Sequence, residues 1–163
     1  MGSDLSGFVL RPTAAGRLWA TSVGAIVVEL PFDLALIPFS NEVSKTMGAG
    51  PDRYGQFRTL STTLAEHGRR LSAEAPLAYV AEESFGGLGW QEAVGWRGGD
   101  VAFQPRFTSD DFEDDRFEIV DDVHDHAVNQ ALRWFGVDRG DSFDEFQAVG
   151  FDQCRSTEDW YKR

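Results

Sequence analysis

The chain contains few cysteines and lysines. Cys154 is the only cysteine among 163 residues, so no disulfide can form within the chain and a reducing compartment is expected. Lysine occurs only at Lys45 and Lys162, and the remaining basic residues are arginines. This bias is typical of a GC-rich bacterium and carries no information about function.

Long apolar runs are also missing. The most apolar stretch, residues 24–39, is broken by four polar or proline residues: Glu29, Pro31, Asp33 and Pro38. A membrane-spanning helix needs about 20 apolar residues in succession. Residues 1–8 lack the basic and apolar regions of a secretory signal. The sequence therefore predicts a cytoplasmic protein without a membrane partner.

Positive charge is scarce relative to negative charge. The chain has 27 Asp and Glu against 15 Lys and Arg, a net charge of −12 and a pI near 4.5. Proteins that bind nucleic acids need clustered basic residues, so this class is excluded, as is attachment to anionic membranes. Residues 1–75 are neutral, with seven charges of each sign, and residues 76–163 carry eight basic and twenty acidic residues. Such asymmetry predicts one strongly acidic face.

The apolar content is sufficient for a single folded domain over residues 1–163. Hydrophobic residues make up 42% of the chain and aromatic residues 13%. Helices are expected over residues 41–47, 54–73, 123–135 and 142–149. The last of them is predicted to begin at a capping box at Ser142. An edge strand is expected over residues 7–10. Further strands are expected over residues 25–30, 33–39, 77–82, 90–96 and 101–104, with a hairpin turn at residues 97–100. The resulting fold class is α+β, with an antiparallel or mixed sheet of five to six strands and helices packed on one face.

The acidic segment around residues 110–125 is the first candidate site. Its expected contacts with a basic partner are Asp110, Asp111, Asp114, Asp115 and Asp121. A calcium-binding loop is excluded because Arg116 occupies the position that requires glycine. Asp122 and His126, four residues apart on the expected helix, are a weak alternative as metal ligands, and no cofactor is predicted.

A second candidate site involves carboxylates beside an aromatic strand. Glu82 and Glu83, with Trp90 and Trp96, could line the pocket of an enzyme or of a ligand-binding protein. Neighbouring residues of a strand point to opposite faces, so the two glutamates cannot both face one pocket unless the strand is bulged. No motif of a catalytic nucleophile surrounds Cys154. Whether the chain is an enzyme stays open.

Two stretches resemble a known family: residues 78–89 (AYVAEESFGGLG), and a set downstream that comprises residues 129–132 (NQAL), 136–137 (GV), 144–146 (DEF), Gly150 and 155–160 (RSTEDW). Together they resemble a family of small acidic uncharacterised proteins of actinobacteria, some of which are similar to immunity proteins of toxin systems. The resemblance covers roughly residues 77–160 and identifies no catalytic residue. With the charge, it favours a non-enzymatic acidic protein-binding module, an immunity-type inhibitor of a basic toxin. The pocket protein is the alternative, and homodimerisation through an edge strand at residues 101–104 is a third hypothesis.

Overall fold

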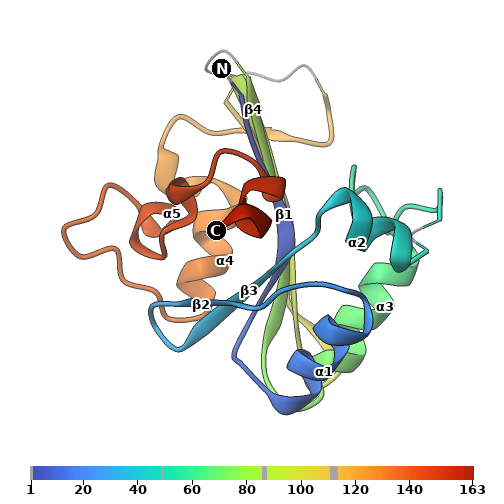
Figure 1. Ribbon diagram of the computed structural model, residues 1–163. Helices are drawn as coiled ribbons and strands as arrows, with labels where there is room; N and C mark the ends of the chain where they lie inside the picture. Colours follow the sequence, from blue (N-terminus) through green and yellow to red (C-terminus); the bar gives the residue numbers. More distant parts are fainter. Residues whose placement is uncertain (1, 49, 86–87, 111–113) are drawn as a thin grey trace.

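The computed structural model describes residues 2–48, 50–85, 88–110 and 114–163 (Figure 1). Its strands are β1 (Ser3–Leu10), β2 (Val28–Leu30), β3 (Leu34–Pro38), β4 (Leu77–Phe85), β5 (Leu88–Arg97), β6 (Asp100–Ser109) and β7 (Glu118–Ile119). Its α-helices are α1 (Ala14–Ser22), α2 (Asn41–Thr46), α3 (Thr62–Leu71), α4 (Ala127–Trp134) and α5 (Glu145–Ala148). Short 3₁₀ helices are η1 (Val123–Asp125), η2 (Phe151–Gln153) and η3 (Thr157–Lys162).

The described strands form one open mixed sheet in the order β2-β3-β1-β4-β5-β6-β7. All neighbours pair antiparallel except β6 and β7, which are parallel. The α+β class is thus confirmed, with seven strands instead of five or six. The expected edge strand at residues 7–10 is in fact the second half of β1, which lies between β3 and β4.

Helices cover both faces of the sheet rather than one. Helices α1, α2 and α3 pack on one face, which we call the α3 face, and α4 and α5 pack on the other, the α4 face (Figure 1). The reason is visible in the inner strands: every residue of β3, and residues 77–82 of β4, are buried. Apolar side chains that alternate between two buried faces require a cover on each of them.

Helix α3 begins eight residues later than the expected Tyr54. Ser61 caps it by accepting a hydrogen bond from the backbone N–H of Leu64. The preceding residues form a turn instead, because the carboxylate of Glu92 on β5 binds the backbone N–H groups of Arg58 and Thr59. Phe57 and Leu60 are buried from this turn and not from a helix.

The second half of the chain contains two shifted helix starts. The expected helix over residues 123–135 is divided, because His126 is extended and separates η1 from α4. Helix α5 is capped by Asp144, whose carboxylate accepts from the N–H of Gln147, and not by Ser142. The acidic segment therefore reaches α4 through a turn and not through a helix.

Strand β6 is poorly suited to pair with another strand. Its outer edge is covered by β7 only at Thr108 and Ser109. Along the rest of β6 the pairing with β5 shifts register twice, and Pro105 has no backbone N–H to donate. Bulges and proline are the devices that keep edge strands from adding further strands, so the geometry disfavours a homodimer through residues 101–104.

The C-terminal segment completes the side of β1 that β3 does not reach. The N–H of Asp4 donates to the backbone oxygen of Arg155, and the N–H of Ser6 donates to the hydroxyl of Thr157. A capping box between Ser156 and Asp159 starts η3 at this point. Among the described helices, none has the length and apolar character needed to cross a membrane.

Candidate functional site

The acidic segment is fixed to the body of the protein on both sides of β7. Phe117 is buried and its ring packs against Trp90 and Phe107. Residues 118 and 119 pair with β6, and the N–H of Val120 donates to the oxygen of Ser109. The carboxylates that follow are therefore presented from an ordered backbone.

Asp110, one of the expected contacts, is bound to a buried relay. The hydroxyl of Thr108 accepts from the N–H of Ala127 at 2.9 Å and faces Nδ1 of His126 at 3.1 Å. Because a carboxylate only accepts, Nε2 of His126 is the donor in its 2.9 Å hydrogen bond to Asp110. This relay anchors the N-terminus of α4 to β6 and engages both nitrogens of His126.

A valine at position 108 tests this relay. Thr108→Val keeps the shape of the side chain but leaves the buried N–H of Ala127 and Nδ1 of His126 without their partner, which we expect to lower the free energy of unfolding by about 1–2 kcal/mol. Urea unfolding monitored by tryptophan fluorescence measures the effect. Thr108→Ser is the matched control, since it keeps the hydroxyl. A loss in Thr108→Ser without one in Thr108→Val would show that the methyl group, and not the relay, stabilises this junction.

The other expected contacts differ in how exposed and how compensated they are. The Arg116 guanidinium donates to Asp114 and lowers the pKa of that carboxyl to about 2, so the charge of Asp114 is neutralised locally. Asp115 and Asp121 are exposed. Asp111 lies outside the described residues.

Five exposed carboxylates define what we call the acidic face. They lie just before β7, in β7, or between β7 and α4. Within the described residues none of them takes part in an ion pair: Asp115, Glu118, Asp121, Asp122 and Asp125. Ile119, 57% exposed, lies among them. The face is therefore an uncompensated anionic surface with an apolar element.

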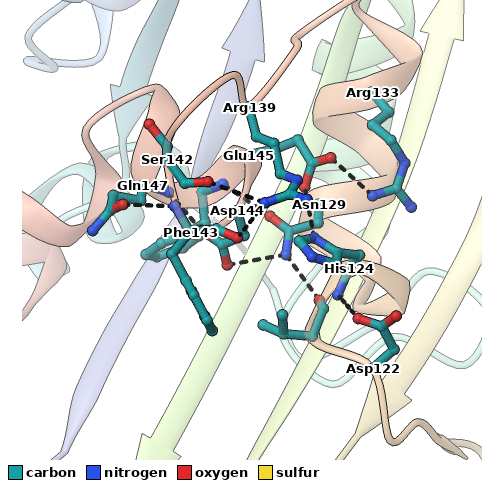
Figure 2. A network of polar contacts seen from close by, with 12 residues as sticks. Asp122, His124, Asn129, Arg133, Arg139, Ser142, Phe143, Asp144, Glu145 and Gln147 are labelled. Atoms are coloured by element: carbon teal, nitrogen blue, oxygen red, sulfur yellow. Dashed lines mark hydrogen bonds and ion pairs between the residues drawn. The ribbon is translucent and has the colours of Figure 1, made fainter.

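A buried set of hydrogen bonds, which we call the Asn129 network, supports this face (Figure 2). The side-chain amide of Asn129 donates to the backbone oxygen of Val123 at 2.9 Å and to Asp144 at 3.2 Å. Its oxygen accepts from the N–H of Phe146 at 2.9 Å. Asn129 is 1% exposed, so one buried side chain ties η1, α4 and the turn before α5 together.

The same network contains a pair of buried polar atoms without partners. Nδ1 of His124 and Oε2 of Glu145 lie 3.7 Å apart, and neither makes a hydrogen bond within the described part of the chain. The other oxygen of Glu145 accepts from Arg133 at 3.1 Å (Figure 2). Asp122 accepts from the N–H of His124 and so caps η1. Asp122 and His126 are thus occupied separately, and the described residues contain no cluster of three or more groups arranged to hold a metal.

The residues of the alternative site are only partly brought together. Glu82, Glu83 and Trp90 line a cavity of about 600 Å³ at the end where β1 begins and β4 ends. Trp96 lies near the other end of β5, where it is buried against Tyr54 and Gly68. Glu82 is buried on the α4 face, beside Leu5 and opposite Gln91, whereas Glu83 is exposed on the α3 face. The alternation expected for a strand therefore holds.

A second cavity, of about 400 Å³, adjoins the first. The two cavities share Asp4, Ser6 and Thr59, and we call them together the β1 cleft. The second cavity is lined further by residues of α2, α3, β4 and η3 and by Phe39, which follows β3; among them are Ser44, Leu64, Tyr79 and Glu158. Sequence reasoning missed these residues because they come from distant parts of the chain that no local pattern connects.

The residues that carry the family resemblance have structural roles. Asn129 and Asp144 hold α4 to α5, and Ser156 and Asp159 cap η3. Thr157 binds β1. These residues therefore stabilise the fold, and their contacts give no information about an activity. Comparisons with protein-family models, curated protein sequences and solved structures found no match to this chain.

Proposed function

We propose that the protein is a non-enzymatic binding module whose acidic face recognises a basic protein. The observation that carries the proposal is the set of five exposed carboxylates that have no ion-pair partner among the described residues. Like charges held together raise the energy of the unbound surface, and a positively charged partner relieves that repulsion. The same charges accelerate association by electrostatic steering.

Rigid support for the acidic face strengthens this proposal. The bond from Val120 to Ser109 holds the backbone before residue 121, and the Asn129 network and the Thr108–His126 relay hold it at Val123 and Ala127. A surface that is ordered before binding loses less conformational entropy when the partner docks. Phe143 adds an aromatic group that is 65% exposed, and its side chain extends away from the polar groups of the network (Figure 2). Exposed aromatic side chains commonly supply binding energy at protein interfaces.

The resemblance to immunity proteins adds a finer proposal, that the partner is a basic toxin and that binding inhibits it. The affinity should then fall with ionic strength, because exposed charges are screened within about 8 Å at physiological salt. The overall net charge of −12 fits a partner of opposite sign.

Affinity capture with charge-matched baits tests the proposal. The variant Asp115→Asn/Glu118→Gln/Asp121→Asn/Asp125→Asn removes four charges from the acidic face and leaves the capping residue Asp122 intact. We expect it to lose at least about tenfold in affinity for a basic protein that the wild type captures from the native host.

The control bait carries four exposed substitutions elsewhere, Asp33→Asn/Glu42→Gln/Asp52→Asn/Glu74→Gln, and has the same net charge. It should retain the partner, and titration calorimetry with the purified partner gives both affinities. Equal affinities of the two four-site variants would show that net charge alone, and not the acidic face, drives binding.

A further inference from the structure

We propose that the β1 cleft binds a small organic cation, an ammonium or guanidinium group carried on a short aliphatic chain. The acidic face does not enter this site, so the inference is independent of the proposed function. The cleft combines a concave shape, a described lining that has carboxylates but no basic side chain, and an apolar wall.

The charge of the cleft is of one sign. Its described lining includes the carboxylates of Asp4, Glu83 and Glu158, and no lysine, arginine or histidine. Asp4 and Glu83 face each other in register across β1 and β4, with both side chains exposed. Side chains directly opposite in an antiparallel pair lie about 5 Å apart, and like charges at that spacing repel. A bound cation would remove this repulsion.

Acceptor atoms are available where the two cavities meet. One oxygen of Asp4, Oδ2, accepts from the N–H and hydroxyl of Thr157, and Oε1 of Glu158 accepts from the N–H of Asn41. The second oxygens, Oδ1 of Asp4 and Oε2 of Glu158, have no hydrogen-bond partner among the described residues. Both carboxylates are therefore held in place through one oxygen while the other can accept from a ligand.

The wall of the second cavity suits an aliphatic chain. Phe39 and Tyr79 stack with their ring centroids 6.2 Å apart, and Leu64 and Met47 lie beside them in the lining. The hydroxyl of Tyr79 is turned to Thr59 at 2.6 Å, and Thr59 in turn donates to Glu92 at 2.7 Å. The polar edge of the cavity is thus fixed before a ligand arrives, which lowers the entropic cost of binding.

Isothermal titration with three small probes tests the ligand class. Agmatine and putrescine carry the cationic groups, and 1,4-butanediol has the chain of putrescine without charge. We expect saturable one-to-one binding of at least one cation and none of the diol. No saturable binding of either cation or of the peptide described below, or equal binding of the diol, would overturn the proposal.

Variants locate the site. Asp4→Asn/Glu158→Gln preserves the oxygens that accept from Thr157 and Asn41, so the fold should persist, and we expect the affinity for the cation to fall about tenfold or more. Ser44→Phe fills the second cavity without changing charge and should abolish binding. Asp115→Asn, a single charge removed from the acidic face, is the control and should bind as the wild type does. Wild-type affinity in Asp4→Asn/Glu158→Gln with intact circular dichroism would place the ligand elsewhere and refute the assignment.

A blocked peptide with one arginine, acetyl-Gly-Arg-Gly-amide, distinguishes the two sources of such a cation. Binding of agmatine or putrescine without the peptide indicates a free metabolite. Binding of the peptide indicates that the cleft accepts a side chain of a protein. Asp115→Asn changes the acidic face and leaves the cleft untouched. A negative result for cation binding by the cleft is therefore distinguishable from a negative result for protein binding by the acidic face.

Discussion

Replacing Glu92 by glutamine is expected to lower the free energy of unfolding by about 2–4 kcal/mol, a fall in Tm of about 5–15 °C. The side chain of Glu92 has no exposed surface, yet both of its oxygens are used. Oε2 accepts from the N–H of Arg58 at 2.9 Å, and Oε1 accepts from the N–H and the hydroxyl of Thr59 at 2.9 and 2.7 Å.

An amide cannot reproduce this arrangement. Glutamine has one acceptor oxygen, and its NH₂ group must face at least one of the N–H donors, so a buried donor loses its partner. The turn over residues 53–61 then loses the contact that shapes it, and Thr59 no longer has a fixed place in the β1 cleft. The variant should therefore also bind a cation more weakly.

Thermal and urea unfolding of Glu92→Gln measure the loss. Glu83→Gln, an exposed glutamate of the neighbouring strand, is the matched control and should change the free energy of unfolding by less than about 0.5 kcal/mol. A loss below about 1 kcal/mol at position 92 would mean that the turn forms without the carboxylate.

Glutamine at position 82 is expected to have the opposite effect, a gain of about 2–3 kcal/mol at pH 8 that vanishes near pH 4.5. Glu82 is 8% exposed, and this burial raises its pKa to about 7 against the partial compensation of a hydrogen bond from Ser3. The nearby charges of Asp4 and Glu83 raise the pKa further.

The sign follows from proton binding. Between pH 4.5 and 7 the folded protein keeps a proton on Glu82 that the unfolded chain releases, so the wild type loses stability as the pH rises through this window. Glu82→Gln removes the titration and keeps a side chain that can bond to Ser3. Its advantage therefore grows with pH.

Urea unfolding at pH 4.5, 6 and 8 for both proteins gives the difference curve. Glu83→Gln, adjacent in sequence and exposed on the other face, serves again as the control and should show a much smaller pH dependence. A constant difference between Glu82→Gln and the wild type at all three pH values would contradict the assignment, because a titrating group cannot produce it.

The strands were the most predictable part of the fold. The β5–β6 hairpin follows from two apolar strands around Gly98 and Gly99, which adopt the positive φ values that the turn needs. The presence of helices on the second face of the sheet was harder to predict from the sequence. A buried strand such as β3 appears as a continuous apolar run whether helices cover one face of the sheet or both. Pairing order was not accessible either, which is why β1 was expected at an edge.

The predicted start of helix α3 was wrong because a side chain distant in sequence binds the backbone N–H groups at that position. Phe57, Leu60 and Leu64 have helical spacing, but Glu92, far along the chain, captures the N–H groups that a helix would use. The candidate site shows the same limit. The density of charge after residue 110 was evident, yet which aspartates are compensated depends on Arg116 and His126 and could be assigned only from contacts.

The contacts of β1 with residues 155–157 have a consequence for synthesis of the chain. Strand β1, which is translated before the other described strands, lies near the middle of the sheet and is completed along one side by a segment translated about 150 residues later. Until that segment has left the ribosome, the outer half of β1 has no partner on that side. Contacts of such long sequence separation form slowly. The nascent chain is therefore expected to depend on chaperones that cover its apolar N-terminal strand during translation.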